Sequence, residues 1–281
     1  MKSISELQDI ASQVRRDIIR MTAQAKSGHP GGSLGCADFL TTLYFNVMQV
    51  NPARFKMSGE GEPLFFLSNG HISPLLYSVL ARRGYFPINE LGTFRRLDSR
   101  LQGHPSITHG LPGIRMASGS LGQGLSAAIG AALTKKLDGD PSLVYCLCGD
   151  GELQEGQNWE AIMFAPAKNV DNLIAVVDFN RLQIDGSTQK VCDLGDLSTK
   201  FKAFGWQVLE MDGHNIEAIL ATLDEAKQKL ANGKPVFIVM KTEMGHGVDF
   251  MTNNNKFHGA VTNEEQTKSA LSQLKETLGD Y

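Results

Sequence analysis

The N-terminal part of the chain alternates between helical patterns and polar breaks. Apolar residues recur there at steps of three and four positions, which predicts an amphipathic helix. These residues are Leu7, Ile10, Val14, Ile18 and Met21. The segment SGHPGGSLG at 27–35 is rich in glycine and interrupts the pattern. A second helical pattern runs through 39–47, and the polar segment 51–63 is predicted to be a loop.

Strand-like and helix-like segments alternate along the rest of the chain. Short apolar runs predict strands at 64–67, 143–148, 173–178, 206–211 and 236–240. Helical patterns lie at 73–83, 120–137, 156–166, 216–230 and 263–278. Strands interleaved with helices indicate βαβ crossovers, so we expect an α/β fold with a mostly parallel sheet and helices on both faces. Because no repeat or linker divides the sequence, we expect residues 1–281 to form one domain.

The composition is that of an ordinary globular protein, with 42% hydrophobic and 20% charged residues. A net charge of −3 gives no general attraction to nucleic acids or acidic membranes, so an anionic ligand would need a local site. The N-terminal segment contains acidic residues and lacks the continuous apolar core of a signal peptide, and no segment approaches membrane-spanning length. We therefore expect a cytoplasmic protein that binds neither nucleic acid nor membranes.

The four cysteines show no C-x-x-C spacing and no disulfide framework. They are Cys36, Cys146, Cys148 and Cys192. Cys146 and Cys148 alternate with apolar residues in a predicted strand, so both should point to one face. We expect buried, reduced thiols rather than a redox or metal site.

A Gly-Asp-Gly sequence marks the end of one predicted strand. Asp150, between Gly149 and Gly151, follows that strand, and Asn180 follows the next one 30 residues later. Ligands of open parallel sheets bind beyond the carboxyl ends of the strands, where both side chains should lie. A carboxylate, an amide oxygen and a backbone carbonyl, the last from Leu182, suit Mg²⁺ or Ca²⁺. Gly-Asp-Gly by itself is also a common turn, but its pairing with Asn180 favours a metal–diphosphate site.

A second glycine-rich segment, GSLGQG at 119–124, opens a helix rich in alanine. Glycines at a helix N-terminus permit tight packing and expose backbone N–H groups to an anion. The order GxxGxG differs from the GxGxxG dinucleotide fingerprint, and no strand clearly precedes it, which disfavours a nicotinamide site. A turn that only packs a small-residue helix is the structural alternative.

Four of the seven histidines lie in turns rich in glycine, proline or serine. They are His29 in SGHPGG, His71 in SNGHIS, His104 in LQGHPS and His258 in FHGA. His104 belongs to the irregular segment 93–119, and ordered loops of that length are usually functional. A lone histidine is most often a surface or satisfied core residue, but the repeated setting indicates a shared role. Because the i, i+4 spacing of a zinc pair is absent, we favour proton transfer and oxyanion or phosphate contacts.

These motifs, in this order, resemble the N-terminal part of transketolases. The matching segments are SGHPGGSLG, LSNGH, LQGHP, GSLGQG, GDGELQEGQNWEA, NLIAVVDFNRLQIDG and FHG, which span 27–259. GDG with a later D-x-N is typical of thiamine-diphosphate enzymes in general, and the histidine turns with GSLGQG are specific to the transketolase group. The resemblance implies the thiamine-diphosphate-binding fold and the transfer of a two-carbon ketol unit from a phosphorylated ketose to an aldose. The cofactor supplies the electron sink for that reaction.

The resemblance also implies roles for particular residues. The divalent metal that holds the diphosphate would be ligated by Asp150, Asn180 and the Leu182 carbonyl. The cofactor would be contacted by His71, Gly119, Leu121, Gly151, Asn180 and His258. The catalytic residues that address substrate oxygens would be His29, His104 and His258. Glu155 resembles a carboxylate near the cofactor that communicates with its counterpart across a subunit interface.

Full-length transketolases continue into a second domain, which binds the aminopyrimidine ring and supplies a glutamate that activates the cofactor. Nothing in this sequence resembles that domain. The sequence is therefore either a fragment of a transketolase or, as we favour, the N-terminal subunit of a split transketolase, active with a C-terminal subunit in an α2β2 heterotetramer. SNGHIS departs from the family's commoner small residue after the histidine, which affects the expected shape of the pocket.

Three alternatives are compatible with parts of the pattern. A 1-deoxyxylulose-5-phosphate synthase-like half is disfavoured by LQGHP and GSLGQG, and a 2-oxoacid dehydrogenase α subunit lacks the histidine turns. A non-catalytic, cofactor-binding regulatory subunit is disfavoured because the histidines are retained together with Asp150 and Asn180.

Overall fold

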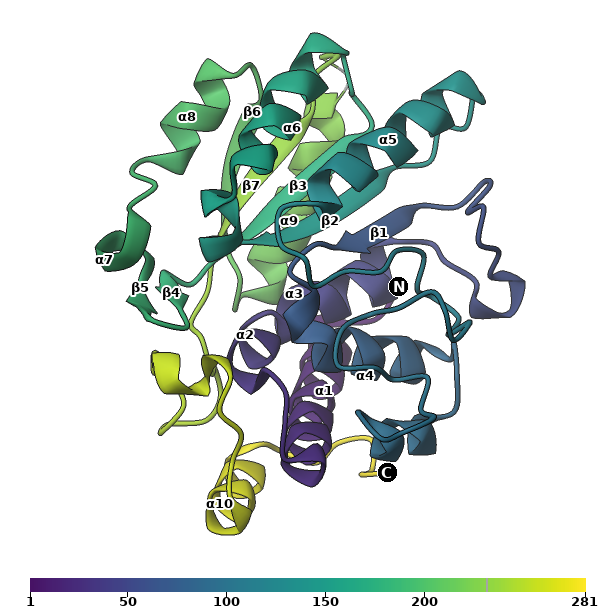
Figure 1. The fold of residues 1–281 in the computed structure, drawn as a ribbon. Coiled ribbons are helices and arrows are strands. Elements are labelled where there is room, and N and C mark those ends of the chain that lie inside the picture. The colour runs from purple at the N-terminus through teal and green to yellow at the C-terminus, as the bar shows by residue number, and fades with distance from the viewer. Residues whose placement is uncertain (231) are drawn as a thin grey trace.

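The structure, a computed structural model, describes residues 1–230 and 232–281. Five parallel strands form one sheet in the order β1-β2-β3-β7-β6 (Figure 1). These strands are β1 (Leu64–Leu67), β2 (Val144–Gly149), β3 (Leu173–Phe179), β6 (Gln207–Asp212) and β7 (Val236–Lys241). Two short antiparallel strands, β4 (Leu182–Gln183) and β5 (Gly186–Ser187), follow β3.

Helices precede, separate and follow the strands. The longer helices are α1 (Ile4–Ala25), α4 (Ser73–Arg83), α5 (Gly124–Leu137), α6 (Gly156–Ala167), α9 (Ile216–Leu230) and α10 (Glu264–Gln273). The shorter ones are α2 (Pro30–Gly35), α3 (Ala37–Thr42), α7 (Thr188–Cys192) and α8 (Leu197–Ala203). Short turns of 3-10 or π type are η1 (Leu43–Val47), η2 (Pro52–Arg54), η3 (Gly70–Ile72), η4 (Ile88–Thr93), η5 (Gly151–Gln154) and η6 (Asn255–His258).

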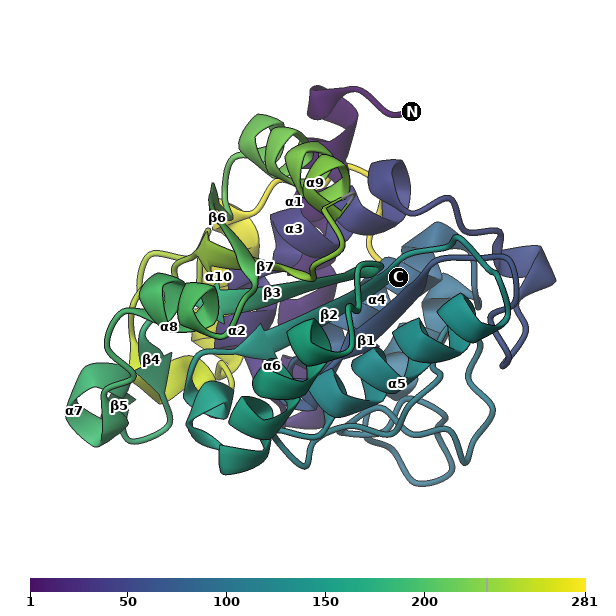
Figure 2. The ribbon, with the colours of Figure 1, turned by 90° about the horizontal axis from the view of Figure 1, so that it is seen from above.

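Helices cover both faces of the sheet. Figure 2 shows α1, α3 and α9 on one side and α5 and α6 on the other. On the first side, Tyr145 and Ile174 belong to a buried cluster with residues of α1, α3, α4 and α9. On the second side, Cys146 and Val177 pack with residues of α5, α6 and α8. Successive residues of a strand point to opposite faces of the sheet, and both are apolar here. This is expected of a parallel sheet between two helical layers.

The predicted α/β architecture and the pattern of elements are confirmed. The predicted bounds of β1, α4 and α9 agree with the structure. The helix expected at 120–137 begins later, because Gly119 and Gly122 adopt φ values of +124° and +87°, outside the helical region. The C-terminal helix also ends earlier than predicted, at Gln273, and the predicted loop 51–63 contains η2. No prediction covered α7 and α8, which follow β5.

The cysteine prediction holds for three of the four residues. Cys36, Cys146 and Cys148 are buried and free, whereas Cys192 is exposed, contrary to the expectation of a buried thiol. The sulfurs of Cys146 and Cys148 are 3.8 Å apart, which confirms that both point to one face of β2. In the described part of the chain, no helix combines the length and apolar character needed to cross a membrane.

Candidate active site

Four histidines from distant parts of the sequence meet in the structure. The ring centroid of His29 lies 5.2 Å from that of His71, 6.1 Å from that of His104 and 5.6 Å from that of His258. The rings of His71 and His258 are 4.9 Å apart. The structure thus brings together all four histidines that the sequence singled out, and we refer to them as the histidine cluster.

Close backbone packing brings two segments that are far apart in the sequence, around His29 and His258, into this cluster. His29 is the residue before α2, and His258 ends η6. A Cβ atom on Gly31 would lie 2.7 Å from the carbonyl oxygen of Phe257, so α2 and η6 can approach only because residue 31 is glycine. The Gly245 N–H donates to the Gly31 carbonyl at 2.9 Å, which also ties α2 to the turn that follows β7.

Burial keeps the imidazoles of the cluster neutral. It lowers the pKa of His29 to about 4, with further repulsion from His258, Arg95 and His104. It also lowers the pKa of His71 well below its usual value, and the pKa values of His104 and His258 shift in the same direction. The Nδ1 atom of His29 is buried and has no hydrogen-bond partner among the described residues. A neutral ring with a free nitrogen can bind or exchange a proton with a ligand oxygen.

The predicted metal ligands lie at the carboxyl ends of β2 and β3. Asp150 follows β2, and its carboxylate accepts the N–H groups of Gly151 at 2.7 Å and Arg181 at 2.5 Å. Asn180 directly precedes Arg181, and its Oδ1 accepts the Leu182 N–H at 2.9 Å. One hydrogen-bonded turn therefore connects the three positions for which metal ligation was expected.

A further carboxylate, Asp178, belongs to this region. It ends the buried part of β3, pairs with Gly149 in the sheet and accepts a hydrogen bond from Asn180 Nδ2 at 2.8 Å. The Thr242 hydroxyl also donates to it. No role was predicted for Asp178, although it is the first residue of the D-x-N pattern. The sequence signal that could have identified Asp178 is a carboxylate at the end of an apolar strand.

The two acids fit a divalent cation. Burial, and then the charge of Asp178, raise the pKa of Asp150 to about 7, and burial also raises the pKa of Asp178. Among the described residues, no lysine or arginine side chain pairs with either carboxylate. A cavity of about 330 Å³ opens beside Asp150 and is lined also by Phe179, Arg181 and Thr188. Two buried carboxylates and an amide form a hard oxygen donor set, suited to Mg²⁺ or Ca²⁺.

Helix α2 connects the strand ends with the histidine cluster. A Cβ atom on Gly32, three residues after His29, would lie 3.9 Å from Asp178 Oδ2. The thiol of Cys36, just beyond α2, lies near the same carboxylate and counteracts part of the rise in the pKa of Asp178. Helix α2 therefore begins at His29 of the cluster and passes beside the Asp178 carboxylate.

The glycine-rich segment 119–124 borders the cluster. A Cβ atom on Gly119 would lie only 2.6 Å from His104 Cδ2, so the bare backbone packs directly against that ring. The Leu121 carbonyl accepts a hydrogen bond from Gln157 at 3.1 Å, which fixes the segment to α6. Gly119 thus packs against a ring of the histidine cluster, and Gly151 begins η5 beside Gln183.

The buried glutamate of the GDGELQEG motif is Glu152, not Glu155. Glu152 accepts hydrogen bonds from Ser68 at 2.5 Å and from the N–H groups of Gly122 and Gly149 at 2.9 Å each. It therefore joins the ends of β1 and β2 to the glycine-rich segment, and burial raises its pKa. Glu155 is exposed at the start of α6, and its carboxylate accepts no hydrogen bond from the described residues. The sequence alone could not show which acid points inward.

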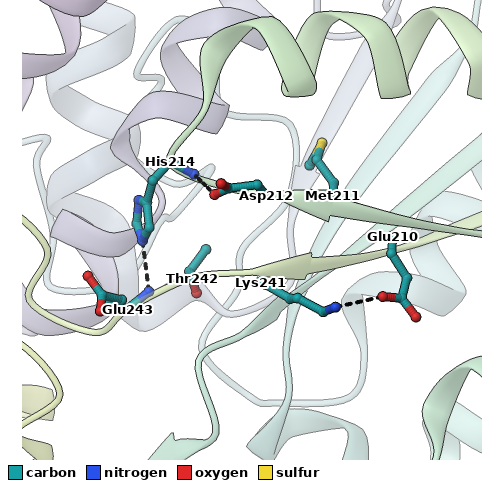
Figure 3. A pocket seen from close by; sticks show the side chains of 7 residues that line it. All are labelled: Glu210, Met211, Asp212, His214, Lys241, Thr242 and Glu243. Atoms are coloured by element: carbon teal, nitrogen blue, oxygen red, sulfur yellow. Dashed lines mark hydrogen bonds and ion pairs between the residues drawn. The ribbon is translucent and has the colours of Figure 1, made fainter.

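A second polar region lies at the carboxyl ends of β6 and β7. Figure 3 shows a cavity there, of about 460 Å³, and the side chains around it. Its lining residues are Glu210, Met211, Asp212, His214, Lys241, Thr242 and Glu243. The ring of His214, which lines the cavity, stacks on the ring of His246 with centroids 3.6 Å apart. Asp38, His214 and His246 each have one potential metal-ligating atom within 4.8 Å of the other two.

Hydrogen bonding argues against a metal at these three residues. His214 Nε2 accepts the Glu243 N–H at 2.8 Å (Figure 3), so the proton of the neutral ring is on Nδ1. That Nδ1 atom faces Asp38 at 3.5 Å, and Arg15 binds both oxygens of Asp38, at 3.1 and 2.5 Å. A protonated ring nitrogen beside an arginine-paired carboxylate is a poor ligand set, and the arrangement is a polar network between α1, α3 and the 243–246 turn.

Fold and site together define a class of protein, an α/β protein with oxygen donors at the ends of its strands and a cluster of buried imidazoles at the start of a short helix. The sequence matches the model of the family described as transketolase, thiamine diphosphate binding domain, over residues 7–279. The chain belongs to the transketolase family. It is a thiamine-diphosphate-dependent transferase chain of that family, and the comparisons do not favour the other thiamine-diphosphate enzymes or a regulatory subunit.

The chain is similar to relatives of two lengths. It is 40% identical to the 6-deoxy-6-sulfo-D-fructose transketolase subunit SqwG of Clostridium sp. strain MSTE9, with 96% of each chain covered. It is 36% identical to an apulose-4-phosphate transketolase subunit of Actinobacillus succinogenes, with 98% of each covered. The transketolase structure from Campylobacter jejuni matches with a TM-score of 0.89 and 34% identity, over 97% of this chain but 43% of that one.

Proposed function

We propose that this chain is the N-terminal subunit of a split transketolase, which transfers a two-carbon ketol unit from a phosphorylated or sulfonated ketose to an aldose. The observation that carries the proposal is the convergence of four histidines in one cluster, in a protein that also places Asp150 and Asn180 at the ends of adjacent strands. The relatives that the chain matches over their whole length are named as transketolase subunits, for substrates with an anionic group. These similarities support a metabolic role in carbohydrate conversion, and we propose that the chain acts in the cytoplasm.

Thiamine diphosphate would be held through its diphosphate by Mg²⁺ or Ca²⁺ on Asp150, Asn180 and the Leu182 carbonyl. Gly151 leaves room for phosphate oxygens near the backbone, and when bound, the cofactor supplies the electron sink for carbon–carbon cleavage. His71, Gly119, Leu121 and His258 would line the rest of the cofactor. We base these roles on the family pattern and on the donor set at the strand ends.

The neutral histidines of the cluster would handle substrate protons. His29, with its free Nδ1, can accept a proton from a substrate hydroxyl and return it later in the cycle. His104 is the most exposed ring of the cluster, which suits contact with an incoming substrate, and His258 can reach cofactor and substrate. The exposed Glu155 would communicate with a second copy of the site across a subunit interface.

The proposed partner is a C-terminal subunit that binds the aminopyrimidine ring, in an α2β2 assembly. The pure chain should be inactive with thiamine diphosphate and Mg²⁺, and the co-purified partner should restore transfer from a panel of phosphorylated and sulfonated ketoses. Robust turnover by the pure chain would refute the split arrangement. A complex that binds cofactor tightly but transfers nothing from any ketose would instead identify a regulatory subunit.

A further inference from the structure

Arg95 is a partly buried cation beside the histidine cluster. Its Nη1 donates to the Ser27 hydroxyl at 3.1 Å, and its Nη2 donates to the Gly103 carbonyl at 3.4 Å. Ser27 precedes His29 by two residues, and Gly103 directly precedes His104. The guanidinium therefore connects the two turns that carry these histidines. In the part of the chain that the structure describes, no carboxylate pairs with Arg95, and its Nε is buried without a partner.

The backbone holds Arg95 in an unusual conformation for this contact. Its φ of +58° lies in the left-handed region, which a long side chain rarely adopts. The Arg95 N–H donates to the Leu101 carbonyl at 2.9 Å, and the guanidinium carbon lies 5.5 Å from the Phe94 ring centroid. A Cβ atom on Gly103 would be 2.6 Å from that same carbon. Strain of this kind persists where surrounding contacts over-determine it, often at functional sites.

The charge of Arg95 acts on both neighbouring imidazoles. It contributes, after burial and His258, to the lowered pKa of His29, and after burial it lowers the pKa of His104. The other charged groups that shift the pKa of His29 are His258 and His104, and both lower it as Arg95 does. A permanent cation at this place opposes protonation of the rings.

We propose that Arg95 is a positioning residue of the active site, which aligns the turns of His29 and His104 and keeps a fixed positive charge beside both rings. Two neutral, aligned bases are what proton exchange with substrate oxygens requires. Arg95 would act through the histidines and would not itself bind the substrate. The effect on turnover rests on the proposed function, whereas the effect on the histidines does not.

The isolated chain tests the charge directly. Imidazole proton resonances of His29 and His104, assigned with His29→Gln and His104→Gln, are followed by NMR across pH. Arg95→Met should raise both pKa values, and Arg95→Lys, which keeps the charge, should leave them close to those of the unsubstituted chain. Arg96→Met is the matched control, because Arg96 is the exposed neighbour. Unchanged titration in a folded Arg95→Met chain would overturn the proposal.

Turnover in the assembled complex tests the alignment, and it does so even if Arg95→Met fails to fold. Lysine cannot span both turns, so Arg95→Lys should lower kcat about tenfold, with KM nearly unchanged, for a phosphorylated and for an uncharged ketose alike. A rise in KM confined to the phosphorylated ketose would overturn the proposal, because Arg95 would then bind the substrate anion. Shifted histidine pKa values in a complex that transfers nothing would refute the proposed function and leave the charge effect standing.

Discussion

The strand-end acids and the histidine cluster are connected through α2, which starts after His29 and passes beside Asp178, and burial shifts their pKa values in opposite directions. It raises the pKa of Asp150 to about 7 and lowers the pKa of His29 to about 4. Burial favours the neutral form in both cases. The histidines are therefore already in the form that exchanges protons, whereas the carboxylates need a cation before they ionise fully. Under the proposed function, the same desolvation would prepare one region for proton exchange and the other for a metal.

The two regions also differ in how the chain builds them. Asp150 and Asn180 follow adjacent strands of one sheet, so their proximity is fixed by the regular spacing of the strands. The histidines come from four separate turns, which meet through close packing at Gly31 and Gly119. We therefore expect substitutions at the strand ends to affect binding, and substitutions in the cluster to affect the rate.

The largest expected effect is on binding. Asp150→Ala removes a carboxylate ligand and should weaken Mg²⁺-dependent binding of thiamine diphosphate to the assembled complex by at least about 100-fold. Calorimetric titration measures this affinity. Asp185→Ala is the matched control, since Asp185 is an exposed acid in the same turn region. Equal affinities for the Asp150→Ala complex and the control would remove the metal assignment.

A smaller effect, on rate alone, is expected in the cluster. His104→Ala should lower kcat about 100-fold, because one group that exchanges protons with the substrate is lost, and should leave cofactor affinity within about twofold. Steady-state kinetics and the same calorimetric titration separate the two quantities. His109→Ala removes an exposed histidine from the same irregular segment and should change neither. Loss of cofactor binding in the His104 variant would contradict the expectation that the histidine cluster affects the rate and the strand ends affect binding.

The smallest expected effect is on the pH dependence of folding. Between about pH 4 and 6.5 the unfolded chain binds a proton at His29 that the folded chain does not, so this group makes stability rise with pH. Asp150 does the reverse between its ordinary pKa of 3.8 and about 7, because the folded chain holds the proton there. The two contributions therefore oppose each other near pH 5.5.

Substitution should expose each contribution. Relative to the unsubstituted chain, His29→Gln should make the slope of unfolding free energy against pH more negative, and Asp150→Asn should make it more positive. Each change should approach about 1.4 kcal/mol per pH unit. Urea unfolding of the isolated, cofactor-free chain between pH 4.5 and 6.5 measures both slopes, with His109→Gln as a neutral control. Slope changes of the same sign in the two variants would contradict the opposed titration.

Several parts of the fold could be predicted because the signal is local. The apolar run of β1 and the helical periodicity of α9 gave their observed bounds. The start of α5 was missed, since it depends on the positive φ values of Gly119 and Gly122, which follow from packing against His104 and α6. The small elements α7 and α8 carry few apolar residues and lie outside the main alternation, so periodicity did not reveal them.

The site likewise has residues that the local sequence could identify and residues that only the packing revealed. Residue types in punctuated turns were enough to select the histidines and Asp150. They could not show that Glu152, rather than Glu155, turns inward, because both acids follow the same strand within a few residues. The role of Arg95 was equally hidden, since nothing in its local sequence indicates that it reaches the turns at Ser27 and Gly103.

The sequence by itself determined which chemical groups the protein has and which regular elements carry them, because hydrophobic periodicity and turn residues act over a few neighbours. Tertiary structure decided which of those groups meet and in what protonation state. Distances between turns and the burial of a side chain depend on packing between residues far apart in the chain, and desolvation then sets the pKa. In this protein that packing passes through α2, where Gly31 lets the segment of His258 come close and Gly32 lies beside Asp178.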